Sequence, residues 1–243
     1  MKDQMKARAA AIAEALKEIK DGMIIGYGSG TTIQQLTPEL KRFMDENGYD
    51  LSFIPSSLQS KDLLLTHGMR LVTLDEFPQP DLVIDSFDQT DEEGNVIKGG
   101  GGALLREKVL AQSASRVLYI GDHLKLSRKL SKPIPVEILE YAYPYVKLVL
   151  ESWSMKLNPR VSEGKLGPIV TENGNILADV DAGEIERPEE LDEKLRYISG
   201  ILETGLFPRY ADLIIIGYPN GKTKKINVNR RRVIRRDEIR IRQ

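Results

Sequence analysis

Short apolar segments alternate with helical patterns through the first half of this chain, and that alternation limits the possible folds more than any other feature. The segments expected to be buried strands lie at 23–27, 51–54, 70–74, 81–84 and 116–120. Helices are expected around 31–44, 58–67 and 103–112, after a first helix with helically spaced Met5, Ala9, Ile12, Leu16 and Ile19. Such alternation predicts an α/β fold with a doubly wound, mostly parallel, Rossmann-like sheet.

The pattern changes near residue 132. Further helices are expected at 143–153 and 188–197, and further strands at 168–171, 176–180 and 212–217. The dipeptide Asn173-Gly174 between two of these strands is a strong signal for a β-hairpin turn. The strand at 212–217 has the buried pattern of the first half and is expected to rejoin the first sheet.

These observations predict two domains. Residues 1–131 plus 204–243 are expected to form a Rossmann-like catalytic domain. Residues 132–203 are expected to form a smaller α+β, ferredoxin-like domain inserted between them.

Cysteine is absent from the 243 residues, and His67 and His123 are the only histidines. Disulfides, thiolate nucleophiles and Cys-ligated zinc are therefore excluded, and a His-driven triad has little support. Carboxylates and lysines must carry any acid-base chemistry. No run of apolar residues is long enough to span a membrane, and the first 20 residues lack the apolar core of a secretory signal, so we expect a cytoplasmic protein.

The net charge of −1 is unevenly distributed. Residues 222–243 contain ten basic and two acidic side chains, whereas the rest of the chain contains 25 basic and 34 acidic ones. A basic tail on an acidic body can bind nucleic acid. We favour an added edge strand or a subunit contact, because 232–235 and 239–242 partly alternate in polarity and the tail has no aromatic side chain to stack on bases.

A glycine-rich loop with the sequence Gly-Tyr-Gly-Ser-Gly-Thr-Thr over 26–32 joins the first strand to the next helix. Its backbone N–H groups and the helix N-terminus can hold an anion, and Ser29, Thr31 and Thr32 add hydroxyl donors. No lysine follows as in a P-loop, and the third glycine of a dinucleotide-binding motif is missing. An ordinary strand-helix turn with Thr31 as N-cap is the alternative, and the loop alone leaves both open.

Two aspartates, Asp85 and Asp88, directly follow another predicted strand. The carboxyl ends of strands form the ligand crevice of an open α/β sheet, and two carboxylates there can handle hydroxyl protons or orient a lysine. A polar capping loop is the alternative.

Four successive glycines at 99–102 stand between Lys98 and a helix that carries Glu107. Such a run is costly in conformational entropy and suits a place where the backbone passes close to a ligand. Glu107 alone would be interpreted as a solvated helix residue beside Arg106 and Lys108. A fourth segment, 121–125, again follows a strand; its Lys125 could reach a phosphate, or it could be an ordinary surface lysine.

Taken together, the four segments indicate more than each does alone. Each follows a predicted strand, so a parallel sheet would gather all of them at one edge. They would bring hydroxyls, N–H groups, lysines and carboxylates together as an anion site beside an acid-base site, without a metal or redox group.

The same segments resemble the type A ribose-5-phosphate isomerase family. The run Lys-Gly-Gly-Gly-Gly-Ala-Leu-Leu-Arg-Glu-Lys at 98–108 is close to the family pattern K-G-G-G-x-A-L-x-R-E-K, and the similarity extends from about Arg8 to Gly221. Supporting pieces lie at 133–137, 170–175, 179–181 and 203–207. The resemblance implies interconversion of D-ribose 5-phosphate and D-ribulose 5-phosphate, in the non-oxidative branch of the pentose phosphate pathway, without metal or cofactor.

The resemblance also implies roles for individual residues. Glu107 is expected to be the base that moves a proton between C2 and C1 of an enediol(ate). Lys98 and Asp85 are expected to polarise or protonate the C1 and C2 oxygens, and Asp88 to help open the furanose ring or position Lys98. The expected substrate contacts are Ser29, Gly30, Thr31, Thr32, Ser86, Phe87, Gly99, Gly100, Gly101, Lys125 and Arg8.

The chain departs from the family pattern in a few places. The aspartate loop usually reads D-G-A-D-E, whereas here Phe87 is bulkier and Gln89 is uncharged. Arg8 stands where some members have a lysine. These changes leave the chemistry intact and the sugar preference open, and a homodimer or homotetramer is expected.

Two other interpretations are a sugar-phosphate-sensing domain without catalysis and a coenzyme A transferase with Glu107 as nucleophile. Sensors of the first kind usually carry a helix-turn-helix ahead of the sensing domain, and we expect too few residues for one before the first strand at 23–27. The clustered hydroxyls favour an isomerase over the transferase.

Overall fold

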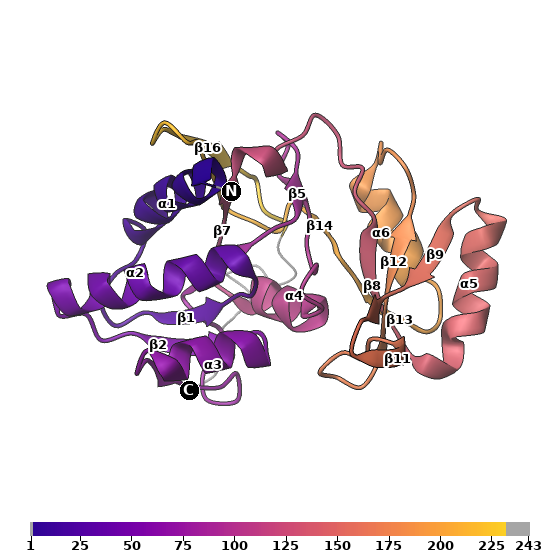
Figure 1. The fold of residues 1–243 in the computed structure, drawn as a ribbon, viewed down its shortest axis with the longest axis horizontal. Helices are drawn as coiled ribbons and strands as arrows, with labels where there is room; N and C mark the ends of the chain where they lie inside the picture. Colours follow the sequence, from indigo (N-terminus) through magenta and orange to yellow (C-terminus); the bar gives the residue numbers. More distant parts are fainter. Residues whose placement is uncertain (1, 232–243) are drawn as a thin grey trace, which may run out of the picture.

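A seven-stranded sheet forms the centre of the computed structural model, which describes residues 2–231 (Figure 1). Its order is β16-β15-β7-β4-β1-β2-β3, and every strand is parallel to its neighbours except β16, which pairs antiparallel with β15. The strands are β1 (Ile24–Tyr27), β2 (Ser52–Pro55), β3 (Arg70–Leu71), β4 (Leu82–Ser86), β7 (Arg116–Asp122), β15 (Leu213–Gly217) and β16 (Thr223–Asn227). The predicted doubly wound α/β fold is confirmed.

Helices cover both faces of this sheet because each strand is apolar on both sides. The first face is packed by α1 (Lys2–Leu16), α2 (Thr31–Asn47) and α3 (Leu58–Thr66), which share one apolar core with the sheet. The other face is packed by α4 (Leu104–Ser113), whose Leu110 and Ala111 belong to a second core. Alternate residues of β7 go to opposite cores: Leu118 to the first, Tyr119 to the second.

The buried face of α1 differs from the predicted one. Met5 is 58% exposed, whereas Ala7, Ala11, Ile12 and Ala15 are buried. Alanine side chains let the helix approach the sheet closely, and α1 passes so near β15 that a Cβ on Gly217 would overlap the backbone of Ala7. The spacing of large apolar residues therefore mispredicted which face of α1 is buried.

A second sheet of four antiparallel strands lies to the right in Figure 1. It has the order β13-β8-β12-β9 and is formed by β8 (Ile134–Ile138), β9 (Lys156–Pro159), β12 (Ile176–Asp181) and β13 (Ile201–Thr204). The helices α5 (Tyr143–Ser152) and α6 (Pro188–Arg196) share its core. Strand β8 was not predicted, because Pro133 and Pro135 interrupt the apolar pattern and proline has no N–H for a sheet.

The predicted hairpin around Asn173-Gly174 is wrong in its first arm. The turn is present, since the N–H of Thr171 donates to the carbonyl of Asn175 at 2.8 Å. The two arms also pair briefly, through a bridge between Val170 and Ile176 and a bond from the N–H of Leu177 to the carbonyl of Ile169 at 3.0 Å, but 169–171 is not a regular strand. The first arm instead enters β11 (Lys165–Pro168), which pairs with β10 (Val161–Ser162). The turn residues are used elsewhere: the side chains of Thr171, Asn173 and Asn175 donate to the fully buried carboxylate of Glu137.

A small third sheet lies between the two larger ones. Its order is β14-β6-β5, with β5 (Gln89–Thr90), β6 (Asn95–Ile97) and β14 (Leu206–Pro208), and none of these short strands was predicted. Two 3₁₀ turns, His123–Lys125 and Glu140–Ala142, complete the described elements. Lys98 follows β6, so it is carried by this small sheet and not by a strand of the parallel sheet as expected.

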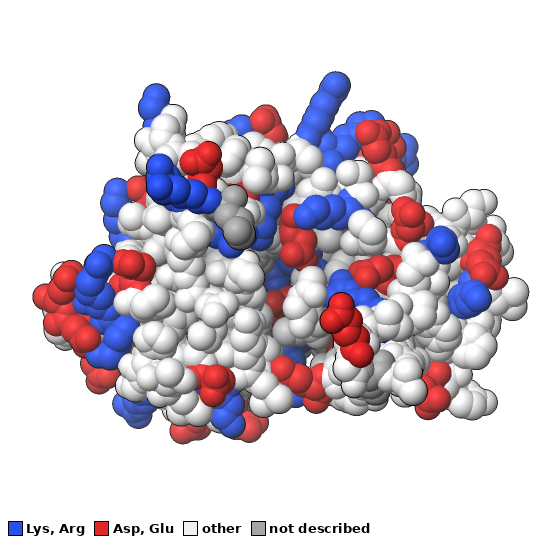
Figure 2. Space-filling model, in the orientation of Figure 1, with Lys and Arg blue, Asp and Glu red and all other residues white. Residues whose placement is uncertain are grey.

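Charges of both signs are mixed on the face shown in Figure 2. Ion pairs along α2, of Lys41 with Asp45 and of Arg42 with Glu39, are examples of neighbouring charges of opposite sign. The basic tail begins as β16, an added edge strand, while the alternating segments 232–235 and 239–242 lie outside the described residues. No helix within 2–231 has the length and apolar character needed to cross a bilayer.

Candidate active site

The first two segments singled out in the sequence meet where β1 and β4 lie side by side. From β1 the chain winds outward through β2 and β3, and from β4 it winds the other way through β7 and β15. Loops diverge at such a switch point and leave a crevice at the carboxyl ends of the strands. The residues that line a pocket there are Ser29, Gly30, Thr31, Ser86, Phe87, Asp88, Lys98, Gly99, Gly100, Gly101, Glu107 and Lys125.

Lys98 is buried between two carboxylates at the floor of this pocket. Its Nζ lies 2.8 Å from Oδ2 of Asp85 and forms a second ion pair with Oε2 of Glu107. The side chains are only 2%, 2% and 5% exposed for Lys98, Asp85 and Glu107. Charges removed from water to this extent interact strongly, so the three groups act as one electrostatic unit.

The three groups are bonded mainly to one another. The ammonium of Lys98 is hydrogen-bonded and ion-paired to both Asp85 and Glu107. Ionisable groups buried together beside a pocket are typical of catalytic sites.

Burial raises the pKa of Glu107 to about 8, with a further rise from the Asp85 carboxylate and an opposing effect from Lys98. Burial would lower the pKa of Lys98, but the carboxylates of Asp85 and Glu107 outweigh that effect and raise it. Lys98 therefore stays an ammonium, while Glu107 can hold and release a proton near neutral pH.

Asp85 is fixed by the backbone around it. Its Oδ1 accepts from the N–H groups of Ser29 at 3.2 Å and Ser86 at 2.6 Å. The β1 loop can come this close because residue 28 is glycine: a Cβ there would overlap the Asp85 carboxylate. The same contact therefore orients the carboxylate toward Lys98 and explains the glycine.

Asp88 contacts the glycine run, and the ion pairs of Lys98 within the described part of the chain go to Asp85 and Glu107 instead. Its Oδ2 accepts from the N–H of Gly100 at 2.8 Å. The carbonyl of Gly100 in turn accepts from Arg160 at 2.7 Å, and Arg160 is held in a two-pronged ion pair by Asp179 of β12. The second sheet therefore helps to shape the glycine loop.

Some of the hydrogen-bond donors expected in the loop at 26–32 already bond to other groups of the protein. Oγ of Ser29 bonds the hydroxyls of Ser56 and Ser57, and the N–H of Gly30 donates to Gln59. Thr31 is exposed at the first turn of α2, whereas Thr32 is fully buried and does not line the pocket. The N-cap is Gly30, not Thr31.

Phe87 lies in the core below the pocket, where it is 1% exposed. Its ring occupies space that a Cβ on Gly121 would need, so glycine at 121 accommodates the bulky residue at 87. Its carbonyl accepts from Nζ of Lys125, and burial, together with nearby Arg8 and Lys132, lowers the pKa of that lysine.

Arg8 reaches the site region from α1 but does not line the pocket. Its Nε lies 3.1 Å from Oδ2 of the buried Asp122, which also accepts from Gln4. Arg8 and Lys132 are nevertheless close enough to Lys125 to lower its pKa, so positive charge gathers on this side of the site.

Sequence reasoning missed several contributors. Lys132 donates to the carbonyl of Asp88 at 2.9 Å, and Gln89 accepts from the N–H groups of Ser131 and Lys132. The amide oxygen of Gln89 thus fixes the backbone at 131–132, and this role needs no charge. Arg160 and Lys132 carry no motif, and only their place in the fold reveals them.

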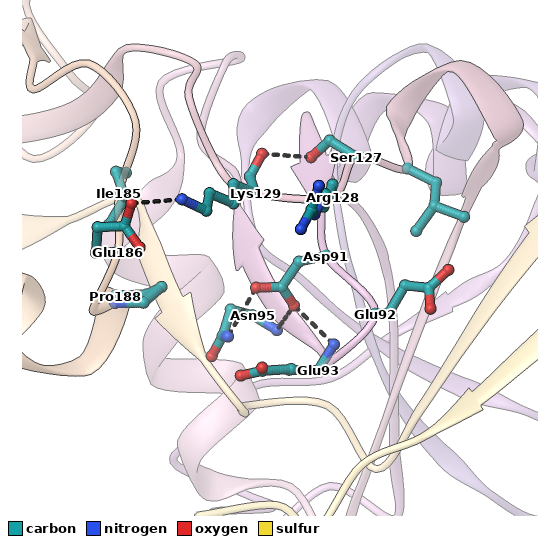
Figure 3. Close-up of a pocket in the computed structure, with 11 residues that line it drawn as sticks. Asp91, Glu92, Glu93, Asn95, Ser127, Arg128, Lys129, Ile185, Glu186 and Pro188 are labelled. Atoms are coloured by element: carbon teal, nitrogen blue, oxygen red, sulfur yellow. Dashed lines mark hydrogen bonds and ion pairs between the residues drawn. The ribbon is translucent and has the colours of Figure 1, made fainter.

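A separate hollow lies away from these residues, beside β6 and the segment 126–129 (Figure 3). Asp91 accepts there from Asn95 and the N–H of Glu93, and Lys129 pairs with Glu186 (Figure 3). None of the expected site residues lines it. The buried unit of Asp85, Lys98 and Glu107 lies instead at the pocket at the switch point, which makes that pocket the stronger candidate for the active site.

Several known proteins are similar to this chain in sequence and in fold. The family model for ribose 5-phosphate isomerase A (phosphoriboisomerase A) matches residues 52–221. The chain belongs to this family. The ribose-5-phosphate isomerase A of Archaeoglobus fulgidus is 43% identical over 206 residues, which cover 84% of this chain and 91% of that protein. The human ribose-5-phosphate isomerase is 33% identical over 88% of this chain and 70% of its own length.

Solved structures of the ribose 5-phosphate isomerase A family have the same fold. That of Methanocaldococcus jannaschii gives a TM-score of 0.85 at 34% identity and covers 92% of this chain and 98% of its own. A D-ribose-5-phosphate isomerase in complex with phospho-erythronic acid gives 0.86 at 33% identity, over 92% and 97%. The family match includes Asp85, Lys98 and Glu107, whereas Arg8 and the first loop precede it.

Proposed function

We propose that Glu107, Lys98 and Asp85 carry out the isomerisation of D-ribose 5-phosphate to D-ribulose 5-phosphate. The activity itself follows from family membership: the chain is a ribose-5-phosphate isomerase of the pentose phosphate pathway. The predicted isomerase is thereby confirmed over the sugar-phosphate sensor and the coenzyme A transferase. The roles of single residues are our proposal.

In the open-chain aldose, the hydrogen on C2 is acidic because the C1 carbonyl lies next to it. Glu107 removes it as a proton, and the electron pair of the C–H bond becomes the C1=C2 double bond. Lys98 stabilises the negative charge on O1 and supplies a proton to it. The O2 hydroxyl then loses its proton to Asp85, the C2=O bond forms, and Glu107 returns its proton to C1. Asp85 passes the proton from O2 to Lys98, whose Nζ lies 2.8 Å away, so both groups return to their starting charge.

The observation that carries this proposal is the buried unit of Asp85, Lys98 and Glu107. A base for carbon acids works best when its pKa lies near the working pH, and burial raises that of Glu107 to about 8. The cation needed at the developing oxyanion is in contact with the base. Asp88, fixed to Gly100, is placed to help open the ring or to hold the glycine loop.

The phosphate is proposed to lie among Lys125, Arg8 and the first turn of α2. Lys125 and Thr31 line the pocket, and a helix N-terminus favours an anion. A relative in this family has been solved with phospho-erythronic acid, a phosphorylated sugar acid. The remaining contacts proposed are those of Ser29, Gly30, Ser86, Phe87, Gly99, Gly100 and Gly101, all of which line the pocket, whereas the buried Thr32 is no longer among them.

An assay of the purified chain across pH, with and without a chelator, tests this function. We expect isomerisation in excess chelator, with kcat/KM rising as pH increases through the region near 8, because Glu107 must lose its proton to act. That limb lies well above the substrate phosphate's own pKa of roughly 6. Loss of activity on chelation would contradict a metal-free reaction, and a rise of kcat/KM centred near pH 4.5 would contradict the role of Glu107.

Lys125→Met should raise KM for ribose 5-phosphate by about ten- to a hundredfold, since it removes a partly buried charge worth roughly 1.5–3 kcal/mol in a charged hydrogen bond. The effect on kcat should be several-fold at most. Lys129→Met removes a cation that pairs with Glu184 and Glu186 outside the pocket and should leave KM unchanged. Equal KM values in the two variants would rule out a phosphate role for Lys125.

We further propose that the enzyme works in the cytoplasm as a homodimer or homotetramer. Support for an oligomer comes from exposed apolar side chains: Tyr145 and Leu148 of α5 are 55% and 65% exposed and lie three positions apart on one side of the helix, and Tyr141, in the turn before it, is 90% exposed. Patches of this kind often mark subunit contacts. Light scattering of the purified chain measures the assembly directly.

A further inference from the structure

The ring of Phe207 lies directly under the ammonium of Lys98, with Nζ 5.0 Å from the ring centroid. We propose that Phe207 is a positioning residue, whose aromatic face holds the Lys98 ammonium between Asp85 and Glu107. The inference deepens the proposed function and rests on it, since it concerns the cation that stabilises the oxyanion. Phe207 itself does not line the pocket, so it acts through Lys98.

Backbone pairing fixes the two residues relative to each other. Leu206 of β14 is opposite Ile97 of β6, and the N–H of Lys98 donates to the carbonyl of Gly205 at 2.9 Å. Lys98 and Phe207 are therefore attached to neighbouring strands of the small third sheet. A shift of one strand would move both the ring and the ammonium.

Neighbouring aromatic rings fix the orientation of Phe207. Tyr210 meets it edge to face at 5.3 Å and 65°, and Tyr119 does so at 6.5 Å and 76°. Edge-to-face contacts of this kind are favourable and leave the face of the central ring available. Phe207 is fully buried, so water does not screen the attraction between its face and a cation.

A second buried lysine anchors the same ring from the other end of the segment. Nζ of Lys108 lies 4.7 Å from the Phe207 centroid and pairs with Glu203 at 2.8 Å and Asp192 at 3.3 Å. Thr204 and Asp192 are also joined by a hydrogen bond. The segment that carries Phe207 is thus held at one end by Lys108 and at the other by β6.

The charged groups around Lys98 set the direction of the effect. Asp85 faces it from β4, Glu107 from α4, and Lys108 lies over the same ring, while Asp88 acts on Glu107 from the loop after β4. Tyr119 lies nearby on β7, and burial raises its pKa, so it stays neutral. If the Lys98 ammonium is held less firmly, Glu107 loses part of the attraction that lowers its pKa.

Fluorination of the ring tests the proposal with little change of shape. Replacing Phe207 by 3,4,5-trifluorophenylalanine withdraws electron density from the ring face and so weakens its attraction for the Lys98 ammonium. We expect kcat to fall by about tenfold with KM nearly unchanged. The pH at which kcat/KM rises, near 8 in the unmodified enzyme, should increase by about one unit. The monofluorinated ring should give intermediate values.

Phe53 provides a matched control, because it is equally buried, meets Tyr27 edge to face, and lies in the other core away from both lysines. The same replacement at Phe53 should change neither kcat nor the pH limb. An unchanged rate and limb for trifluorinated Phe207 would overturn the inference, as would equal effects at both positions. If Glu107→Gln is inactive in that case, the proposed roles of Glu107 and Lys98 still stand, whereas full activity of Glu107→Gln would defeat the proposed role of Glu107 itself.

Discussion

Glu107→Gln should lower kcat by at least about a hundredfold, the usual scale for loss of a general base, while the protein stays folded. Glutamine has the same shape but cannot accept the C2 proton. Lys98 keeps its ion pair with Asp85 in the variant, so no buried cation is left alone. The rate of ribulose 5-phosphate formation and a thermal unfolding curve are the two measurements.

Glu184→Gln is the control for this substitution, because Glu184 is an exposed carboxylate whose Lys129 partner lies outside the pocket. It should keep full activity. The pH profile adds a second criterion: the residual activity of Glu107→Gln should lose the limb near pH 8 that we assign to this carboxyl. Wild-type turnover by Glu107→Gln would show that another group moves the proton.

Lys98→Met should both abolish turnover and destabilise the fold. It leaves Asp85 and Glu107 facing each other in a buried site without their cation. Removing one partner of a buried ion pair costs about 3–5 kcal/mol, and loss of the oxyanion's cation should lower kcat by at least about a hundredfold. Urea unfolding and steady-state kinetics measure the two effects separately.

The double variant Lys98→Met/Asp85→Asn separates stability from catalysis. Removing the charge of Asp85 relieves the repulsion with Glu107, so part of the lost unfolding free energy should return. Activity should not return, because the cation is still missing. A double variant as unstable as Lys98→Met alone would mean that the two carboxylates do not act on each other.

The sequence predicted the parallel sheet because its strands are continuous apolar runs between clear helices. It did not predict β8, whose two prolines hide the pattern, or β5, β6 and β14, which are two or three residues long. Strand β14 is formed by pairing between distant segments, Leu206 with Ile97. Strands β5 and β6 form a local hairpin, with Thr90 opposite Val96, but they are too short to show an alternating pattern. The apolar face of α1 was misjudged because three alanines, together with Ile12, form its buried face.

For the site, motif positions were enough to select Asp85, Lys98 and Glu107, which the fold brings into contact. The residues around them were not predictable in the same way. Arg160 reaches the glycine run from about 60 positions away, and Phe207 reaches Lys98 from about 110. The division into 1–131 plus 204–243 and 132–203 stays a prediction, as do the single roles at the site.

The two outer strands of the seven-stranded sheet are protected against pairing with another molecule. At one side β3 is only two residues long, and at the other β16 carries Lys224 and Lys225, which form ion pairs with Glu92 and Glu14. Short or lysine-bearing outer strands discourage the addition of a further strand. We therefore expect copies of this enzyme to associate through side-chain surfaces and not by extending the sheet, which also limits its tendency to aggregate.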